Sequence, residues 1–347
     1  MSESSGILKA KRCQEPFSPR VKKVPDTFLP PDVSVCIANW NCRAMLRACL
    51  ESLRDQPQGV CLETIVVDNA STDGAADMVA RDFPEVVLIR NPVNAGFSRA
   101  CNQAAEHARG RYLFFLNNDT VVPPHTLGRL LAFAQAHPEA GMIGPRLRDL
   151  DGRTQVSCRP RPTVRTLLHR THLLRWTGLL RNGYQRYRRL ECDVGIEREV
   201  ETLMGAAMFL RREVFFACGR WDEEYTFGGE DFDLSTRIGR RYRLLYLPSV
   251  AIIHHGRSST RANAIYSSPN IAIGFARYLR KSGCSPAAVS FYKLVLALDA
   301  PVQFAVKGVQ YLWRRAQGKR AKAEKSLLAA KTMWYIMTRG LLGLWKA

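Results

Sequence analysis

The sequence predicts an α/β protein whose mostly parallel sheet is flanked by helices and followed by a helical extension at the C-terminal end. Short apolar segments alternate with segments in which apolar residues recur at helical spacing. The short segments are apolar throughout, which is typical of strands buried on both faces of a sheet. Hydrophobic residues make up 46% of the 347 positions, so the chain can bury a large core.

The alternation is clearest between residues 33 and 116. Strands are expected over residues 33–38, 63–68, 86–89 and 112–116, and helices over residues 43–56, 73–81 and 97–107. Ser71 or Asp73 can cap the second helix. Strand–helix–strand units of this kind form parallel sheets with right-handed crossovers. Further ordered segments are expected over residues 200–211, 225–237, 242–255 and from about 268 onward, whereas residues 146–192 show no clear period.

Polar side chains follow each expected strand at the point where it ends. They are Asn39 and Asn41 after the first strand, Asp68–Ser71 after the second, Asn91 and Asn94 after the third, and Asn117–Asp119 after the fourth. Ligands of open parallel sheets bind beyond the carboxyl ends of the strands. The sequence therefore predicts a binding site at this edge of the sheet.

Two acids in this set each allow two interpretations. Asp119 could hold a hard divalent cation that bridges two phosphate oxygens, or it could belong to an ordinary turn. Asp68 could accept a hydrogen bond from the base or ribose of a nucleotide, or it could belong to a loop that leads into a helix cap.

An acidic segment, Trp221–Asp233, stands out because it places six acids in an otherwise basic chain. Gly228 and Gly229 allow a tight turn before a helix that would begin near Glu230. A carboxylate at a helix start is expected to keep a low pKa and could act as a general base. The alternative is an acidic loop whose carboxylates cap the helix.

Two adjacent histidines, His254 and His255, end the last expected strand. A neutral imidazole is a common metal ligand, although a histidine at a strand end can equally be bonded to the backbone.

Taken in order, these motifs resemble glycosyltransferase family 2, which has the GT-A fold, and within it the rhamnosyltransferase-like branch. The resemblance covers residues 33–257. The matching stretches are VSVxIxNWN at 33–41, IVVDNASTDG at 65–74, NxxNAGFS at 91–98, FLNND at 115–119, GAAMFLRR at 205–212, EDxD at 230–233 and HHG at 254–256.

The resemblance implies a role for each matching position. It assigns nucleotide binding to Asn39, Asn41, Asp68, Asn94, Gly96, Phe97 and Asn118. It assigns catalysis to Asp231, the general base, with Glu230 beside it. It assigns Mg²⁺ or Mn²⁺ to Asp119 and His254, with His255 as the alternative. Asn117 stands where many relatives have a second acid, so Asp119 alone brings a charge to the metal.

The same resemblance implies an inverting, metal-dependent glycosyltransferase. The donor would be a nucleotide-diphosphate sugar, dTDP-rhamnose or a UDP-sugar, and the acceptor a hydroxyl of a glycan or lipid-linked glycan in bacterial surface polysaccharide synthesis. A departing diphosphate needs a cation, and direct displacement needs a base on the opposite face of the sugar. The alternative is a catalytically silent relative that binds nucleotide sugar or carbohydrate.

The chain carries 51 Lys and Arg against 31 Asp and Glu, a formal net charge of +20. Such a surplus favours polyanionic partners. No zinc-finger spacing and no basic region with heptads is present, so a nucleic-acid partner is not expected. The first strand leads into Asn39-Trp-Asn-Cys42 rather than a glycine-rich phosphate loop, which argues against a dinucleotide-dependent oxidoreductase.

The charge and pattern divide the chain into three parts. Residues 1–31 are expected to form a flexible leader without a signal peptide, and residues 32–267 the GT-A domain, with an Arg-rich acceptor-side insertion at 153–192. Residues 268–347 are expected to form a basic amphipathic helical region that binds an anionic membrane surface or packs on the domain. We therefore expect a cytoplasmic protein at the inner face of the plasma membrane.

Two further expectations concern membrane spans and cysteines. No run of about 18 uncharged apolar residues is evident, so no spanning helix is expected. The ten cysteines form no C-x-x-C pair and are expected to be reduced, mostly buried thiols.

Overall fold

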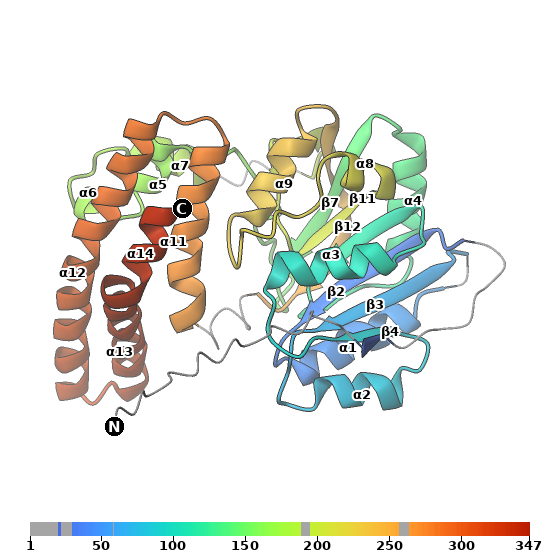
Figure 1. Cartoon of the computed structure of the whole chain (residues 1–347), viewed down its shortest axis with the longest axis horizontal. Helices are drawn as coiled ribbons and strands as arrows, with labels where there is room; N and C mark the ends of the chain where they lie inside the picture. Colours follow the sequence, from blue (N-terminus) through green and yellow to red (C-terminus); the bar gives the residue numbers. More distant parts are fainter. Residues whose placement is uncertain (1–19, 22–29, 58, 189–194, 257–263) are drawn as a thin grey trace, which may run out of the picture.

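The computed structural model describes residues 20–21, 30–57, 59–188, 195–256 and 264–347. An α/β unit lies beside a group of helices formed mainly by the C-terminal part of the chain (Figure 1). Most of the expected leader, and residues 189–192 of the Arg-rich insertion, lie outside the described residues.

Four parallel strands form the half of the sheet that the sequence predicted. They are β2 (Val33–Asn39), β3 (Leu62–Asp68), β4 (Val87–Arg90) and β5 (Tyr112–Leu116). They lie in the order β4-β3-β2-β5, so the chain adds strands on one side of β2 and then crosses to the other side. Such a reversal opens a crevice at the carboxyl ends of the two strands that flank it. Asn39 ends β2 at this point.

The other half of the sheet mixes directions. β11 (Ala207–Arg211) runs antiparallel between β5 and β7 (Ala140–Arg148), and β12 (Arg243–His254) runs parallel to β7. Five two-residue strands complete the edges of the main sheet and form a small second sheet. They are β1 (Arg20–Val21), β6 (Thr120–Val121) and β9 (Arg198–Glu199) in the main sheet, and β8 (Cys158–Arg159) paired with β10 (Thr202–Leu203).

Helices cover both faces of the sheet, as its apolar strands require. One core layer lies between the sheet and α1 (Arg43–Arg54), α2 (Ala75–Asp82) and α4 (Thr126–Ala136). The other lies between the sheet and α3 (Phe97–His107), α8 (Arg212–Ala217) and α9 (Glu230–Ile238). At the start of α2 the Asp73 carboxylate, rather than Ser71, accepts a hydrogen bond from the Ala75 N–H at 3.1 Å.

The helical extension is confirmed. It consists of α11 (Ala264–Lys281), α12 (Pro286–Ala316), α13 (Arg320–Tyr335), the π-helical turn η2 (Ile336–Gly340) and α14 (Leu341–Lys346). The Arg-rich segment adds α5 (Val164–Leu168), α6 (His172–Trp176) and α7 (Arg181–Arg188) to this group. The expected division at residue 267 falls inside α11, and that division stays a prediction.

A glycine contact joins the helical group to the α/β unit. Gly228 and Gly229, with φ of 86° and 95°, form the turn that leads into α9. Gly274 of α11 packs so closely on this turn that a methyl group at 274 would overlap the Gly228 carbonyl oxygen. The three glycines therefore let α11 reach the N-terminal end of α9.

Helix α12 is a candidate membrane span that the sequence analysis did not identify, and the expectation that no helix spans a membrane stays a prediction. It has 31 residues, and its most apolar window has a mean hydropathy of 1.4, so by length and composition it could cross a membrane. The charged residues Lys293 and Asp299 interrupt the apolar sequence of α12. Both side chains are buried against the rest of the protein. One third of the apolar window is buried, and length and composition alone do not distinguish a spanning helix from a packed one.

Among the described cysteines seven are free, as expected, but only three of these are buried; Cys13 and Cys192 lie outside the described residues. Cys36, Cys49 and Cys101 are buried free thiols, and Cys42, Cys61, Cys218 and Cys284 are free with greater exposure. Cys158 is instead disulfide-bonded, which corrects the expectation that every cysteine is reduced.

Candidate active site

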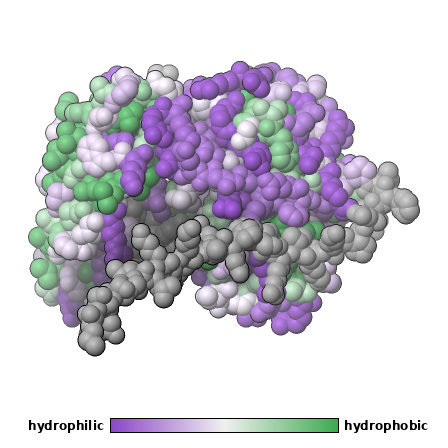
Figure 2. All heavy atoms as spheres, viewed as in Figure 1, coloured by the Kyte–Doolittle hydropathy of each residue, from purple (hydrophilic) through white to green (hydrophobic). Residues whose placement is uncertain are grey.

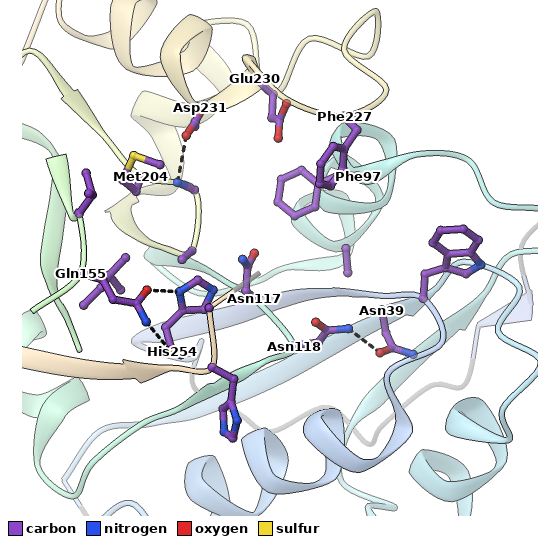
Figure 3. Close-up of a pocket in the computed structure, with 18 of the residues that line it drawn as sticks. Asn39, Phe97, Asn117, Asn118, Gln155, Met204, Phe227, Glu230, Asp231 and His254 are labelled. Atoms are coloured by element: carbon purple, nitrogen blue, oxygen red, sulfur yellow. Dashed lines mark hydrogen bonds between the residues drawn. The ribbon is translucent and has the colours of Figure 1, made fainter. Parts of the chain in front are cut away.

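A cavity of about 700 Å³ opens at the carboxyl ends of β2, β5 and β12 and beneath the start of α9 (Figure 3). Eight of the eleven predicted site residues line it: Asn39, Asn94, Gly96, Phe97, Asn118, Glu230, Asp231 and His254. The other three, Asn41, Asp68 and Asp119, do not line the cavity and instead bond to neighbouring residues. The site therefore has an exposed lining and a supporting layer behind it.

Asn39 connects the lining to that layer. Its Nδ2 donates to Asp68 Oδ1 at 2.9 Å and to Ser71 Oγ at 3.2 Å, and its Oδ1 accepts from Asn118 Nδ2 at 2.7 Å. Asp68 Oδ2 accepts from the Ser71 N–H at 2.9 Å. The Asp68 carboxylate, 3% exposed, thus holds Asn39 and the following loop, and its predicted contact with a nucleotide remains a prediction.

Asn41 builds the loop next to it. The residue has a positive φ of 51°, a conformation that asparagine tolerates better than most residues. Its side-chain oxygen accepts from the Thr72 N–H at 2.8 Å, and its own N–H donates to Ser71 Oγ at 2.9 Å. Asn41 therefore joins the segment after β2 to the segment after β3.

The segment Asn94–Phe97 forms one wall. Asn94 Oδ1 accepts from the Gly96 N–H at 2.9 Å, and the Gly96 carbonyl accepts from Asn69 Nδ2 at 3.2 Å. Gly96 has a φ of 87°, and a Cβ there would lie 3.5 Å from the Thr226 carbonyl oxygen. The glycine thus brings Phe97 to the same wall as Phe227, which follows Thr226.

His254 and Asp119 come together at the opposite side. His254 Nε2 lies 3.3 Å from Asp119 Oδ1, while His255 approaches Asp119 through its backbone N–H, which donates to the Asp119 carbonyl at 2.9 Å. Gln155 Nε2 donates to the His254 carbonyl at 2.6 Å, which leaves Gln155 Oε1 to accept from His254 Nδ1 at 2.8 Å. Nδ1 therefore carries the proton in the neutral ring, and Nε2 faces Asp119 with a free lone pair.

This pair fits a divalent cation that also binds phosphate. In the described part of the chain no group of three or more His, Cys, Asp and Glu side chains is arranged to hold a metal. Mg²⁺ is commonly bound by one or two protein ligands together with substrate phosphates. Asp119 and His254 supply one carboxylate oxygen and one imidazole nitrogen, so the remaining ligands would have to come from a diphosphate and water.

Asp231 lies at the N-terminal end of α9 with both carboxylate oxygens fixed. Oδ1 accepts from the Phe232 N–H at 2.9 Å, and Oδ2 faces the Gly205 N–H at 3.4 Å. Burial raises the pKa of Asp231, and these two N–H groups and the Arg159 charge oppose the rise. The expected low pKa is therefore wrong, because desolvation outweighs the helix start.

Glu230 precedes Asp231 and also lines the cavity. Burial, and after it the negative charge of Asp231, raise the pKa of Glu230 to about 8. The two neighbouring carboxyls therefore do not both ionise at neutral pH.

Gln155, Arg159 and Phe227 are among the lining residues that the sequence analysis did not identify as site residues. Gln155 and Arg159 lie in the Arg-rich insertion that was expected on the acceptor side, but nothing in their local sequence distinguishes them from their neighbours. The Arg159 guanidinium lies 5.4 Å from the centre of the Tyr187 ring. Phe227 lies inside the acidic segment, where the sequence pattern points to the carboxylates as the functional groups.

Comparison with known proteins agrees with this geometry. The chain is 31% identical over 212 residues to the N-acetylglucosaminyl-diphospho-decaprenol L-rhamnosyltransferase of Mycobacterium tuberculosis, a match that covers 57% of this chain and 68% of the relative. It is 29% identical over 248 residues to the O-antigen biosynthesis protein RfbC of Myxococcus xanthus, covering 68% of this chain and 18% of that one.

A solved structure shares the fold. The mannosyltransferase PcManGT from Pyrobaculum calidifontis, in complex with GDP-Man and Mn²⁺, superposes with a TM-score of 0.51 at 20% identity and covers 92% of this chain and 91% of that one. This likeness confirms the predicted GT-A arrangement. The family model described as glycosyl transferase family 2 matches residues 34–216. The chain therefore belongs to glycosyl transferase family 2, as its motifs predicted, and is a glycosyltransferase.

Proposed function

We propose that the protein is an inverting, metal-dependent glycosyltransferase that moves rhamnose from dTDP-rhamnose to a hydroxyl of a lipid-linked glycan during bacterial surface polysaccharide synthesis. The observation that carries the proposal is the placement of Asp231 and the Asp119–His254 pair in the lining or supporting layer of one cavity. A base and a phosphate-binding cation at one site are what a direct displacement requires.

Asp231 would act as the base. Its carboxylate takes the proton of the acceptor hydroxyl as the hydroxyl oxygen forms a bond to C1 of the sugar. The bond between C1 and the phosphate oxygen breaks, and its electron pair leaves with the nucleoside diphosphate. Because the acceptor enters opposite the leaving group, the configuration at C1 inverts. Burial favours this role, since the raised pKa of Asp231 makes its carboxylate a stronger base.

Asp119 Oδ1 and His254 Nε2 would hold Mg²⁺ or Mn²⁺, which would offset the negative charge that develops on the departing diphosphate. Replacement of Asp119 by alanine should remove the metal dependence of donor binding. Equal donor affinity with and without Mn²⁺ in the wild type would exclude Asp119 and His254 from this role.

The choice of donor and acceptor rests on the mycobacterial relative, whose name specifies rhamnose transfer to a diphospho-decaprenol-linked sugar. We test it by calorimetric binding of dTDP, UDP, GDP and CMP, with and without Mn²⁺, followed by a transfer assay with dTDP-rhamnose and UDP-sugars. Metal-dependent binding of dTDP and product from dTDP-rhamnose are expected. Binding without transfer to any acceptor would instead support a catalytically silent relative.

The Asp231→Asn variant tests whether Asp231 acts as the base or contributes to donor binding. Transfer should fall by about 100-fold or more, while donor affinity stays close to that of the wild type, because the base acts in the transition state. Asp77→Asn, which changes an exposed aspartate on α2, is the matched control. An equal loss of donor affinity in Asp231→Asn would exclude Asp231 as the base.

The proposed lipid-linked acceptor places the enzyme at a membrane surface, and α12 offers a face for it. Seven apolar residues with exposed side chains recur every three or four positions along this helix: Phe291, Leu294, Leu298, Pro301, Ala305, Val309 and Leu312. No polar residue interrupts this stripe. Hydrophobic side chains gather along the same edge of the molecule in Figure 2, where the C-terminal helices lie.

The charge of the region favours anionic lipid as the occupant of the stripe. Residues 269–347 hold 14 Lys and Arg against 2 Asp and Glu, a surplus of 12 positive charges. Arg314, Arg315 and Lys319 follow the end of the stripe, where Trp313 is also exposed. Apolar stripes flanked by basic and tryptophan side chains are typical of helices that lie in a membrane interface. We therefore infer peripheral attachment to the cytoplasmic face of the plasma membrane.

Vesicle flotation tests this attachment. The full chain should float with vesicles that contain anionic lipid and much less with purely zwitterionic vesicles. Leu298→Glu should reduce flotation, whereas Gln317→Glu, which adds the same charge at an exposed position off the stripe, should not. Equal flotation of both variants, or a stable dimer that Leu298→Glu dissociates, would exclude lipid as the partner of this stripe.

A further inference from the structure

The carboxyl group of Glu230 has an oxygen without a protein partner at the cavity. Oε2 is buried and makes no hydrogen bond to any described residue. In Figure 3 the carboxyl group points into the cavity from the start of α9, between Asp231 and Phe227. Buried polar atoms without a partner are rare because each one costs free energy, so this oxygen is expected to be satisfied by a ligand.

The surroundings of Glu230 favour its neutral form. Burial and the neighbouring Asp231 charge raise its pKa to about 8, opposed only by the backbone N–H groups of Gly228 and Glu230. Cys101 of α3, which interacts electrostatically with Glu230, stays a neutral thiol, because burial raises its pKa. The Arg159 charge acts on Asp231 instead. Asp231 therefore carries the negative charge of the pair at neutral pH, and Glu230 carries a proton.

A protonated carboxyl group can donate one hydrogen bond and accept others, which suits a sugar hydroxyl. The position of Glu230 favours a contact with the transferred sugar rather than with the acceptor. Glu230 lies beside Phe227 and Phe97, on the wall formed by the Asn94–Phe97 segment, whereas Asp231 lies towards Met204 (Figure 3). Asp231 Oδ2 also faces the Gly205 N–H at 3.4 Å. The two carboxyls thus face different parts of one cavity.

We propose that Glu230 is a positioning residue that donates a hydrogen bond to a hydroxyl group of the transferred sugar and thereby contributes to donor selection. The inference rests on the proposed function, because it requires a sugar in this cavity. It assigns different tasks to the two neighbouring acids: Asp231 accepts a proton from the acceptor, while Glu230 keeps its proton and shares it with the donor sugar.

Two substitutions at Glu230 test this assignment in the purified full chain, with the sugar nucleotide that supports transfer by the wild type. Glu230→Ala should lower kcat/KM for the donor by about 10- to 100-fold, the effect of one lost hydrogen bond to a buried group, with little change in KM for the acceptor. Glu230→Gln should recover at least about tenfold of that loss, because an amide is neutral and can still donate.

The pH profile gives an independent readout. Wild-type activity should fall as the pH rises through about 8, because Glu230 then loses its proton and a second negative charge develops beside Asp231. Glu230→Gln should not show this alkaline decline. Donor analogues that each lack one hydroxyl should identify the bonded group: the wild type should discriminate against one of them, and Glu230→Ala should not.

The outcomes separate this inference from the proposed function. If the wild type transfers sugar and Glu230→Gln is as inactive as Asp231→Asn, Glu230 acts in its ionised form and the inference is wrong, although the proposed function stands. An alkaline decline that persists in Glu230→Gln would overturn it as well. If the wild type transfers sugar from no nucleotide donor, both proposals fail.

Discussion

Gly274 of α11 lies against the carbonyl oxygen of Gly228, two residues before the acid pair of α9, with no room for a methyl group between them. Gly229 is confined as well, though less tightly, since a Cβ there would lie 3.0 Å from the Gly274 carbonyl oxygen. The helical extension thus forms part of the structure that positions Glu230 and Asp231.

Substitution of Gly274 tests this contact. Gly274→Ala should displace the Gly228–Gly229 turn and lower kcat, because the two carboxyls move with it. Gly308→Ala on α12 is the control, since a Cβ at 308 would contact nothing within 4 Å and alanine is favoured in a helix by about 1 kcal/mol. Steady-state kinetics and thermal unfolding of both variants decide the matter; equal activity would show that α11 does not position α9.

Gln155 fixes the ring of His254 through two hydrogen bonds, so its loss should weaken the proposed metal site. We expect Gln155→Met to reduce Mn²⁺-dependent donor affinity by about 10- to 100-fold, the usual effect of losing a partner that orients a metal ligand. Affinity measured without metal should change little. Calorimetric titration with and without Mn²⁺ checks this, and a loss of the same size in both conditions would place Gln155 in nucleotide binding instead.

Asn39 uses both ends of its amide, so a carboxylate cannot replace it. Asn39→Asp would lose the bonds donated to Asp68 and Ser71 and would place a second carboxylate beside Asp68. The free energy of unfolding should fall by about 2 kcal/mol or more. Asn182→Asp makes the same chemical change at an exposed position of α7. Urea denaturation compares the two, and similar losses would contradict the account of Asn39.

Asp299 is the buried acid of the helical extension, with 1% of its surface exposed. Its carboxylate accepts from the backbone N–H groups of His172 and Leu173 at 3.0 and 2.8 Å, and so ties α12 to the first turn of α6. Asp299→Ala should cost about 1–3 kcal/mol of stability, because two partly buried backbone N–H groups lose their partner.

The control for Asp299 is Glu324→Ala, which removes the other acid of the extension from an exposed position on α13. Chemical denaturation should show almost no loss for this variant. A comparable loss in both variants would mean that the charge of the extension, and not the contact with α6, determines the effect.

The sequence predicted the part of the fold in which local pattern and burial agree. The strands that became β2, β3, β4 and β5 are continuous apolar runs, and polar residues mark their ends. The sheet edge could therefore be identified, together with the part of the cavity lining formed by Asn39, Asn94 and Asn118. β7 was missed because Gly141, Gly144 and Pro145 interrupt its pattern. Gly141 and Gly144 are required there by close contacts with Tyr242 and Leu203, which no local sequence pattern reveals.

The electrostatics of the site could not be predicted in the same way. A carboxylate at a helix start is expected to have a low pKa. Burial in the cavity wall instead raises the pKa of both Glu230 and Asp231. Burial depends on the packing of α9 against α11, and hence on residues more than thirty positions away. The same limit applies to Gln155, which reaches His254 across 99 positions of sequence.

The glycine contact between α9 and α11 also has a practical consequence for protein engineering. A chimera made at the apparent boundary near residue 267 would combine an α9 turn from one parent with an α11 from another, and any side chain larger than hydrogen at 274 would collide with that turn. Exchange of donor or acceptor preference between relatives should therefore transplant residues 228–281 as one block, so that the two helices keep the partner with which they fit.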